Sequence, residues 1–399
     1  MDLLLTELQA LTVFRPVLDT PVMTELQAFL RAADTPGERA EAPAHYGKLV
    51  FALREAGAVT LSDCLWQQLC RTDGAFGRAC AVDAADAWFQ AAARADLEIL
   101  NRAAQLDFGA RLQALAEAEP WLAPLTAALP VLPAGAPLEF EALTQSYRHN
   151  GVGIFSQGRA FYWESGVLTP VKHPDPIDCA DMIGYQWQRE EVIQNTRALI
   201  QGRPASNALL YGDSGTGKSA TIKSLINIPE FFNLRIIEVS KNSLDGITEL
   251  SRLVGGHTQK FILYIDDLSF EREDRSFSAL KTALEGGLEL RPDNVVIYAT
   301  SNRRHMVRES FADRQGDEVH VSETIQERTS LSERFGLRVP YMSLSKPEFL
   351  DMVCRMAAHD GLEADPAALR KEASTWEIQH GGRTPRVARQ FVDFKLGQI

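Results

Sequence analysis

The residues of this chain that are best suited to chemistry by type and spacing lie between Gly212 and Ser219. They fit the pattern G-x-x-x-x-G-K-S/T, the phosphate-binding loop that is also called the Walker A motif. Glycines let the backbone approach phosphate oxygens, Lys218 can reach the β- and γ-phosphates, and the Ser219 hydroxyl can bind Mg²⁺. We therefore expect the whole loop to hold a nucleotide: Gly212, Asp213, Ser214, Gly215, Thr216, Gly217, Lys218 and Ser219.

The segments on either side of this loop argue against the alternative, which is a chance glycine-rich turn. Residues 207–211 are a short apolar run that predicts a buried strand, and apolar residues recur at helical spacing over 219–226. The loop would then join a strand to a helix N-terminus, where free N–H groups and the helix dipole favour a bound anion.

Two acidic residues, Asp266 and Asp267, follow the continuous apolar run 261–265, which predicts a strand buried on both faces. We expect this strand to lie beside the loop, so that Asp266 holds Mg²⁺ through its water shell and Asp267 positions or polarises an attacking water. Asn302 follows the predicted strand 294–300 and can share that water with Asp267. The alternative for each of these residues is a surface turn, where Asp and Asn are common.

Arginines near the end of the chain are candidates for contacts with phosphate. Arg334 precedes the predicted strand 337–341 and can neutralise charge on the γ-phosphate of a neighbouring subunit; a surface salt bridge is the alternative. Arg386 stands in the first turn of the last helix, where a cation is poorly placed for the helix dipole, so we expect it to contact phosphate. Arg383 is the second choice and Arg389 stays open, with an exposed arginine on the helix surface as the alternative.

A glycine-centred turn at Ile183 and Gly184 precedes a predicted helix over 187–200, upstream of the loop. Such a turn can cup an adenine base. An ordinary entry into the helix is the alternative.

The predicted elements divide the chain into four parts. Strands and helices alternate between 181 and 343, which predicts an α/β core with a parallel sheet and ligands at the carboxyl ends of its strands. Residues 344–399 predict a helical lid, with helices near 347–358, 366–378 and 385–397. Residues 1–143 predict a mainly helical domain, and 144–180 a hairpin, formed by 153–155 and 160–163, followed by a linker.

Composition narrows the class of protein. The chain of 399 residues has 45% hydrophobic and 24% charged residues, as a soluble globular protein does. Its net charge of −12 disfavours broad binding to nucleic acid, although a local basic patch remains compatible with it. Five cysteines without C-x-x-C pairing indicate reduced thiols and no structural zinc. With no membrane span or signal peptide in the sequence, we expect a cytoplasmic protein.

Five aromatic residues in the first 143 can form either a surface that binds a partner or part of the core, and the core is the commoner outcome. They are Phe51, Trp66, Trp88, Phe89 and Trp121.

In order and spacing, these motifs resemble those of the AAA+ ATPases, and more closely those of an uncharacterised bacterial AAA+ family catalogued as a domain of unknown function. The resemblance covers roughly 145–399. It implies a P-loop NTPase core with a helical lid, and a ring or helical homo-oligomer, of which a hexamer is one form, with ATP at the subunit interfaces. Many AAA+ members have Asp-Glu where this chain has Asp266-Asp267, and replication initiators and helicase loaders often have Asp-Asp.

Two functions follow from the resemblance. The first is an ATPase that uses ATP and Mg²⁺ to remodel a protein or nucleoprotein partner chosen by the helical domain. The second is a nucleotide-gated switch or loader with slow turnover. DNA is an admissible partner that the charge does not indicate, and no membrane is expected. A kinase with a small-molecule acceptor fits less well, because the arginines at 334 and 386 suit an AAA+ interface better.

Overall fold

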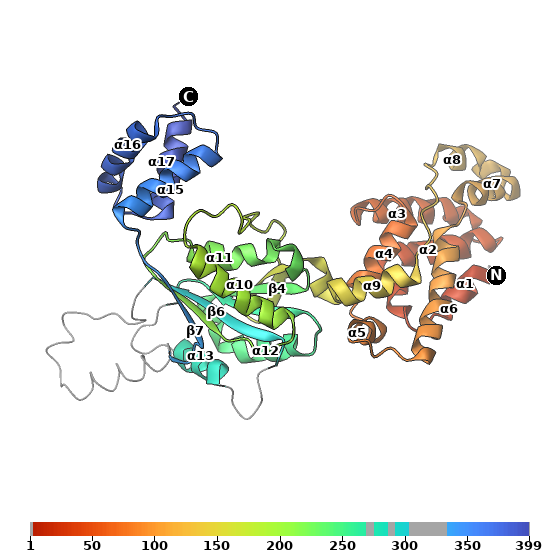
Figure 1. The fold of residues 1–399 in the computed structure, drawn as a ribbon. Helices are drawn as coiled ribbons and strands as arrows, with labels where there is room; N and C mark the ends of the chain where they lie inside the picture. The colour runs from red at the N-terminus through yellow and green to blue at the C-terminus, as the bar shows by residue number, and fades with distance from the viewer. Residues whose placement is uncertain (1–2, 269–274, 286–291, 303–332, 399) are drawn as a thin grey trace. The chain divides into compact units, whose positions relative to one another are not determined.

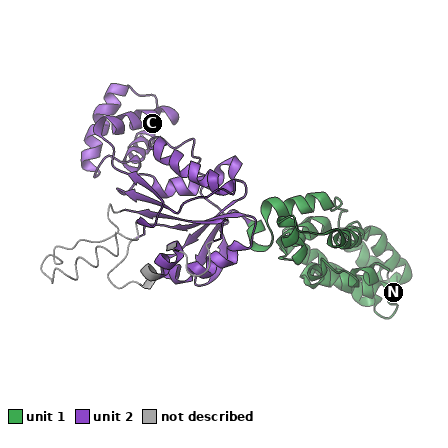
Figure 2. Cartoon of the chain, turned by 60° about the horizontal axis from the view of Figure 1, so that its bottom comes forward, with its two compact units in different colours: residues 1–157 green, residues 158–399 purple. Residues whose placement is uncertain are grey.

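The computed structural model describes residues 3–268, 275–285, 292–302 and 333–398. The chain forms two compact units, Met1–Gln157 and Gly158–Ile399 (Figures 1 and 2). No helix of the described residues is long and apolar enough to cross a membrane.

Unit 1 is built from helices. Several of them start at a side chain that accepts a hydrogen bond from the first turn, as Thr20, Thr60, Asp86 and Asp107 do. The described α-helices of this unit are α1 (Leu3–Gln9), α2 (Pro21–Asp34), α3 (Ala42–Glu55), α4 (Leu61–Arg71), α5 (Ala75–Ala81), α6 (Ala87–Ala104), α7 (Phe108–Ala118), α8 (Ala123–Ala128) and α9 (Phe140–Asn150).

A fully buried tyrosine, Tyr46, joins the aromatic core of unit 1 to the segment at residues 130–132. The rings of Phe29 and Phe108 lie 5.4 and 5.6 Å from the ring of Tyr46. The Tyr46 hydroxyl donates to the carbonyl of Pro130 at 2.8 Å and accepts from the N–H of Leu132 at 2.9 Å. Tyr46 therefore fixes the extended segment 129–139, which crosses this helical unit without secondary structure of its own.

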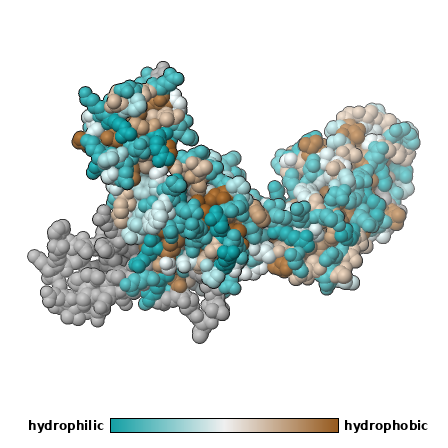
Figure 3. Space-filling view, viewed as in Figure 1, coloured by the Kyte–Doolittle hydropathy of each residue, from teal (hydrophilic) through white to brown (hydrophobic). Residues whose placement is uncertain are grey.

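The aromatic residues considered for a partner surface divide between core and surface. Trp66 and Phe89 are partly buried and pack against the core. Phe51, Trp88 and Trp121 are 67%, 74% and 64% exposed, so the core interpretation is wrong for these three. On the face drawn in Figure 3, the most hydrophobic residues of unit 1 form separate spots among polar ones.

Unit 2 is centred on a seven-stranded sheet in the order β2-β1-β4-β5-β6-β3-β7. The pair β1–β2 is antiparallel, and every other neighbouring pair is parallel. The inner strands β5 and β6 are almost entirely buried, as expected for a sheet covered on both faces. The strands are β1 (Ala160–Glu164), β2 (Val167–Pro170), β3 (Ala208–Gly212), β4 (Leu234–Val239), β5 (Lys260–Ile265), β6 (Val295–Ser301) and β7 (Leu337–Tyr341).

Helices cover both faces of this sheet (Figure 1). On one face lie α10 (Gln186–Ile200) and α11 (Lys218–Ser224), and on the other α12 (Ile247–Gly255) and α13 (Arg275–Glu285). The chain ends in three helices that pack around their own apolar core: α15 (Lys346–His359), α16 (Pro366–Gln379) and α17 (Pro385–Leu396). The predicted fold class, a P-loop α/β core with a C-terminal helical lid and an N-terminal helical domain, is confirmed.

Three details differ from the sequence predictions. Residues Gly153–Gln157 form a 3₁₀ turn, and the hairpin joins β1 to β2 instead. The boundary predicted after residue 143 falls inside α9, and the units separate between Gln157 and Gly158. The strand that carries the acidic pair, β5, is not beside the loop strand β3, because β6 lies between them.

We predict that Tyr46→Phe lowers the free energy of unfolding by about 1–3 kcal/mol, because it leaves the buried N–H of Leu132 without a partner and removes the hydrogen bond to the Pro130 carbonyl. Urea unfolding and hydrogen exchange of residues 129–139 measure the effect. Tyr162→Phe is the matched control, since Tyr162 is 49% exposed, and it should change the free energy by less than about 0.5 kcal/mol. Equal stability and equal exchange in Tyr46→Phe and the unmodified protein would contradict the role of this hydroxyl.

Candidate nucleotide-binding site

The carboxyl ends of β3, β5 and β6 open onto a cavity of about 640 Å³, a size typical of small-molecule sites. Most of the predicted site residues line it, and four do not: Gly212, Asp213, Gly184 and Arg334. Those that line the cavity are Ile183, Ser214, Gly215, Thr216, Gly217, Lys218, Ser219, Asp266, Asp267, Asn302 and Arg386.

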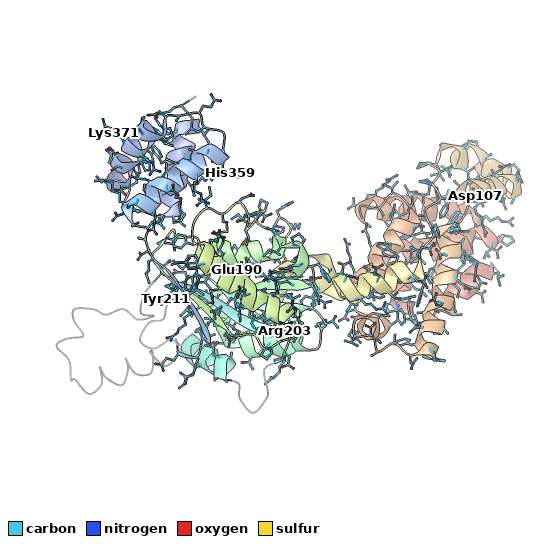
Figure 4. The ribbon with its side chains drawn as sticks, in the orientation of Figure 1. Asp107, Glu190, Arg203, Tyr211, His359 and Lys371 are labelled. Atoms are coloured by element: carbon cyan, nitrogen blue, oxygen red, sulfur yellow. The ribbon has the colours of Figure 1, made fainter. Side chains whose placement is uncertain are left out.

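Strand β3 ends just after Tyr211 (Figure 4), at Gly212, where any residue with a side chain would displace the backbone. Gly212 has φ +137°, and a Cβ added there would lie 2.1 Å from the carbonyl oxygen of Tyr341 on β7. The next N–H, that of Asp213, donates to the same carbonyl at 2.9 Å. Gly212 and Asp213 thus hold the start of the loop against β7 and do not line the cavity, whereas Ser214–Ser219 do.

Lys218 lies at the centre of the loop and is only 5% exposed. Its ammonium donates to the carbonyls of Asp213 at 2.6 Å and Gly212 at 3.2 Å. Burial lowers the pKa of Lys218, because a charged ammonium loses hydration there, and Asp213 and the acidic pair partly oppose this shift. A buried cation held by neutral groups, two carbonyls and, at 3.5 Å, the Thr216 hydroxyl, is suited to a strongly negative ligand such as a phosphate.

The first acidic residue, Asp266, lies beside the loop hydroxyl. Ser219 Oγ donates to Asp266 Oδ1 at 2.8 Å, and Thr300 Oγ1 donates to the same oxygen at 2.6 Å. Burial tends to raise the pKa of Asp266, but hydrogen bonds to its carboxylate, that of Thr300 foremost, outweigh burial and lower it. Asp266 is therefore an anionic oxygen donor next to a hydroxyl, a pair that fits Mg²⁺.

The second acidic residue, Asp267, is held in a left-handed conformation with φ +50°. Asn302 Nδ2 donates to Asp267 Oδ1 at 2.8 Å, and the Lys241 ammonium lies 3.4 Å from Asp267 Oδ2. The contact with Asn302 joins two residues that we predicted to act on one water. Lys241 begins the 3₁₀ turn Lys241–Gly246 after β4, and its contact with Asp267 was not predicted.

The lid helix α17 touches the loop through its first turn. The N–H of Arg386 donates to the carbonyl of Gly215 at 3.2 Å, and a Cβ added at Gly215 would lie 3.1 Å from the Cβ of Arg386. The Arg386 side chain lines the cavity, and no ion pair is found for it among the described residues. Arg386 is therefore placed to meet a ligand in the loop.

The other two arginines of the lid have acidic partners. Arg383 Nε lies 3.7 Å from the buried carboxylate of Glu377 and does not line the cavity. Arg389 lines the cavity but is paired with Asp360 and, at 3.6 Å, with Asp393.

An aromatic pair stands on the side of the cavity where we expected the adenine. The rings of Tyr185 and Tyr341 stack at 5.1 Å with an angle of 21°, and both residues line the cavity. Ile183 lines it as well. Gly184, by contrast, faces the lid, since a Cβ there would lie 2.3 Å from Cε of Met352. Tyr341 is fully buried, so Tyr185 is the ring of this pair that can meet the flat face of a base.

Arg334 lies in the turn before β7 and is not among the residues that line the cavity of its own chain. Its predicted role toward a neighbouring subunit stays a prediction. Residues 303–332, which contain most of the polar stretch before it, lie outside the described residues.

Residues 156–399 match a family described as "Protein of unknown function (DUF815)". This match covers more than half of the chain. The chain belongs to this family. The predicted membership of a family catalogued as a domain of unknown function is thereby confirmed.

Human Replication factor C subunit 4 is 32% identical over 84 residues, which are 20% of this chain and 22% of that protein. The Thermotoga maritima RuvB Holliday junction branch migration motor superposes with a TM-score of 0.37 and 15% identity, over 54% of this chain and 63% of its own. The Aeropyrum pernix ORC1 protein in complex with DNA superposes with a TM-score of 0.36 and 15% identity, over 55% of this chain and 66% of its own. The chain thus spans about a fifth of the first relative, and TM-scores this low carry no argument about function.

Four residues of the site were not found from the sequence. Tyr341 and Thr300 are ordinary strand residues by sequence, and Lys241 follows a strand whose end carries no motif. Only Tyr185 had a signal, because an aromatic residue directly follows the turn at Gly184.

We predict that Gly212→Ala weakens nucleotide binding by at least about tenfold, because any Cβ at position 212 must push the loop away from the Tyr341 carbonyl. Titration with a fluorescent ATP analogue measures the affinity. Gly202→Ala is the control: Gly202 has a positive φ of +68° but open space around it, and it lies outside the cavity. An equal loss of affinity in both variants would show that the effect is one of backbone strain in general.

Proposed function

We propose that this chain is a Mg²⁺-dependent ATP hydrolase that couples hydrolysis to the remodelling of a protein or nucleoprotein partner. One observation carries the proposal: Lys218, the adjacent pair Asp266 and Asp267, and Asn302 come from three separate segments and meet at one cavity. Each has a separate part in phosphoryl transfer, namely charge neutralisation, metal binding, orientation of water and support of that orientation.

The residues present fit both ATP and Mg²⁺. Bound Mg²⁺·ATP would supply the phosphoanhydride bond and the charge compensation between its phosphates. The Lys218 ammonium would exchange its two carbonyl partners for phosphate oxygens, which are stronger acceptors. Ser219 and Asp266 would hold the metal ion. Tyr185, stacked on the buried ring of Tyr341, would bind the base, with Ile183 also lining the cavity.

Asp267 is the residue that would orient and polarise the attacking water. Its side chain is 54% exposed, so water reaches it, and Asn302 fixes the direction of its carboxylate. Arg386 would meet the γ-phosphate from the lid, and Arg334 would act on the site of an adjacent copy in a ring or helical homo-oligomer. The site would then be complete only between subunits.

Unit 1 is the candidate for choosing the partner. It contains 11 Lys and Arg residues against 19 Asp and Glu, so it carries −8 of the net charge of −12. This charge disfavours DNA as its partner and favours a protein surface that is neutral or basic. The three exposed aromatic residues of this unit, Phe51, Trp88 and Trp121, are the type of side chain that anchors protein interfaces.

A second function, a nucleotide-gated switch with slow turnover, is favoured by the ion pair between Lys241 and Asp267. A carboxylate that is engaged by an ammonium is a weaker acceptor for a proton of water. Turnover would then wait until a partner or a neighbouring subunit draws Lys241 away.

Two substitutions test hydrolysis. Lys218→Ala should abolish tight ATP binding, and Asp267→Asn should lower kcat by about 10²–10⁴-fold while ATP still binds. Phosphate release and equilibrium binding of labelled ATP separate the two effects. Lys371→Ala on the lid surface (Figure 4) and Asp293→Asn at the opposite end of β6 are matched, exposed controls. The proposal fails if the unmodified protein, as an oligomer, shows no Mg²⁺-dependent phosphate release above that of Asp267→Asn.

The ion pair between Lys241 and Asp267 has its own test. Lys241→Met should raise basal kcat by about 2- to 5-fold, the effect expected from removing an exposed ion pair of up to about 1 kcal/mol. Lys241→Arg, which keeps the ion pair, should stay near the unmodified rate. Steady-state phosphate release at saturating ATP measures both. A rate for Lys241→Met as low as that of Asp267→Asn would show instead that Lys241 assists catalysis.

A further inference from the structure

Both acidic residues of the site are tied to one hydroxyl, that of Thr300 near the end of β6. Thr300 Oγ1 donates to Asp266 Oδ1 at 2.6 Å, and it accepts from the backbone N–H of Asp267 at 2.9 Å. The residue is only 1% exposed, so water does not compete for these contacts. A hydroxyl has one proton, and here that proton is directed at the carboxylate while a lone pair receives the N–H.

The two hydrogen bonds do different things. The bond to Asp266 fixes the orientation of a carboxylate that is proposed to hold the metal ion. The bond from Asp267 supports its backbone at φ +50°, a region that residues with a side chain adopt at a cost in free energy. The N–H of Leu268 donates to the carbonyl of Thr300 at 2.6 Å, so three successive residues after β5 are held to this one residue of β6.

Binding of a metal ion would make the orientation of the Asp266 carboxylate depend more strongly on Thr300. In the structure, Asp266 Oδ1 receives hydrogen bonds from both Ser219 and Thr300. A Ser219 hydroxyl that binds a metal ion through its oxygen has to turn its proton elsewhere. Thr300 is then the donor that keeps Asp266 oriented, in the way that outer hydrogen bonds commonly orient metal ligands.

We propose that Thr300 is the positioning residue of this site, and that its single hydroxyl sets both the metal-binding geometry of Asp266 and the water-facing position of Asp267. The claim about Asp267 rests on the proposed hydrolysis. The claim about Asp266 rests only on the binding of nucleotide and Mg²⁺. It predicts that one substitution at Thr300 impairs both Mg²⁺ binding and hydrolysis, two defects that would otherwise require two substitutions.

A buried threonine can also serve packing alone, and the neighbouring residue offers a comparison. Ser301 is equally buried, but its hydroxyl donates to the backbone carbonyl of Leu268 at 3.0 Å and not to a carboxylate of the acidic pair. Ser301→Ala therefore removes a buried hydroxyl from the same strand end without disturbing the two hydrogen bonds of Thr300.

The experiment compares Thr300→Val, which keeps the shape and removes the hydroxyl, with Thr300→Ser, which keeps the hydroxyl. Three quantities are measured on the full chain: the affinity for a fluorescent ATP analogue in EDTA, the Mg²⁺ concentration that gives half of the Mg²⁺-dependent gain in that affinity, and kcat. For Thr300→Val we expect an unchanged affinity in EDTA, a Mg²⁺ requirement raised about 10-fold and kcat lowered about 10-fold. Thr300→Ser and Ser301→Ala should both stay within about 3-fold of the unmodified protein.

The affinity in EDTA reports on an intact loop, so its loss in Thr300→Val would mean that this variant is misfolded. The proposal would then be decided by comparing Thr300→Ser with Ser301→Ala. A Thr300→Ser variant with either defect while Ser301→Ala has none overturns the proposal, because the hydroxyl would not be what matters. So does a folded Thr300→Val variant in which the Mg²⁺ requirement is unchanged. If the unmodified protein binds Mg²⁺ and ATP without turnover, hydrolysis fails as the function, while a shifted Mg²⁺ requirement with rescue by Ser still supports Thr300.

Discussion

The site depends on the parallel register of the central strands. Leu210 is paired with Thr300 and Ile265 with Ala299, so β3, β5 and β6 end at nearly the same level. Because β6 lies between β3 and β5, its side chains are the ones that reach the acidic pair from the next strand. A slip of one residue in β6 would turn the Thr300 hydroxyl to the other face of the sheet and remove it from both acidic residues.

The polar groups that this register gathers satisfy one another through hydrogen bonds and one ion pair. The Lys218 ammonium has two carbonyl partners, Asp266 has two hydroxyl donors, and Asp267 has an amide and an ammonium. A ligand gains affinity only from the difference between its own contacts and those that it replaces. A highly charged phosphate can exceed neutral carbonyls as a partner for Lys218, whereas a neutral ligand of the same size cannot. This difference favours highly charged phosphate ligands over neutral small molecules of the same size.

Features that depend on local sequence could be predicted. The loop at 212–219 needs a fixed spacing of glycine, lysine and serine between a strand and a helix, and that pattern is contiguous. Features that depend on strand order could not be predicted, because nothing in the run 261–265 indicates which strand will lie next to it. The places of Thr300 and Tyr341 follow from that order, so both looked like ordinary strand residues.

The hairpin was misplaced for a local reason. Ser165 and Gly166 both have positive φ, at 51° and 81°, which is the two-residue turn that suits the twist of a β-hairpin. Their presence after the aromatic run 160–163 was the available signal. The prediction paired 153–155 with 160–163 instead, although Gly153, with φ +61°, opens a 3₁₀ turn in unit 1.

The contact between lid and loop limits how a bound nucleotide can be sensed. The N–H of Arg386 donates to the carbonyl of Gly215, so the start of α17 is attached to the loop by backbone and not only by side chain. Any shift of Gly215 on ligand binding must therefore move the first turn of α17 or break that hydrogen bond. The helices α15, α16 and α17 share one apolar core, and Met352 of α15 packs against Gly184 in the segment before α10. The lid thus contacts both the loop at Gly215 and the segment that is proposed to hold the adenine, so a displacement of the loop can reach that segment through the shared core of the lid.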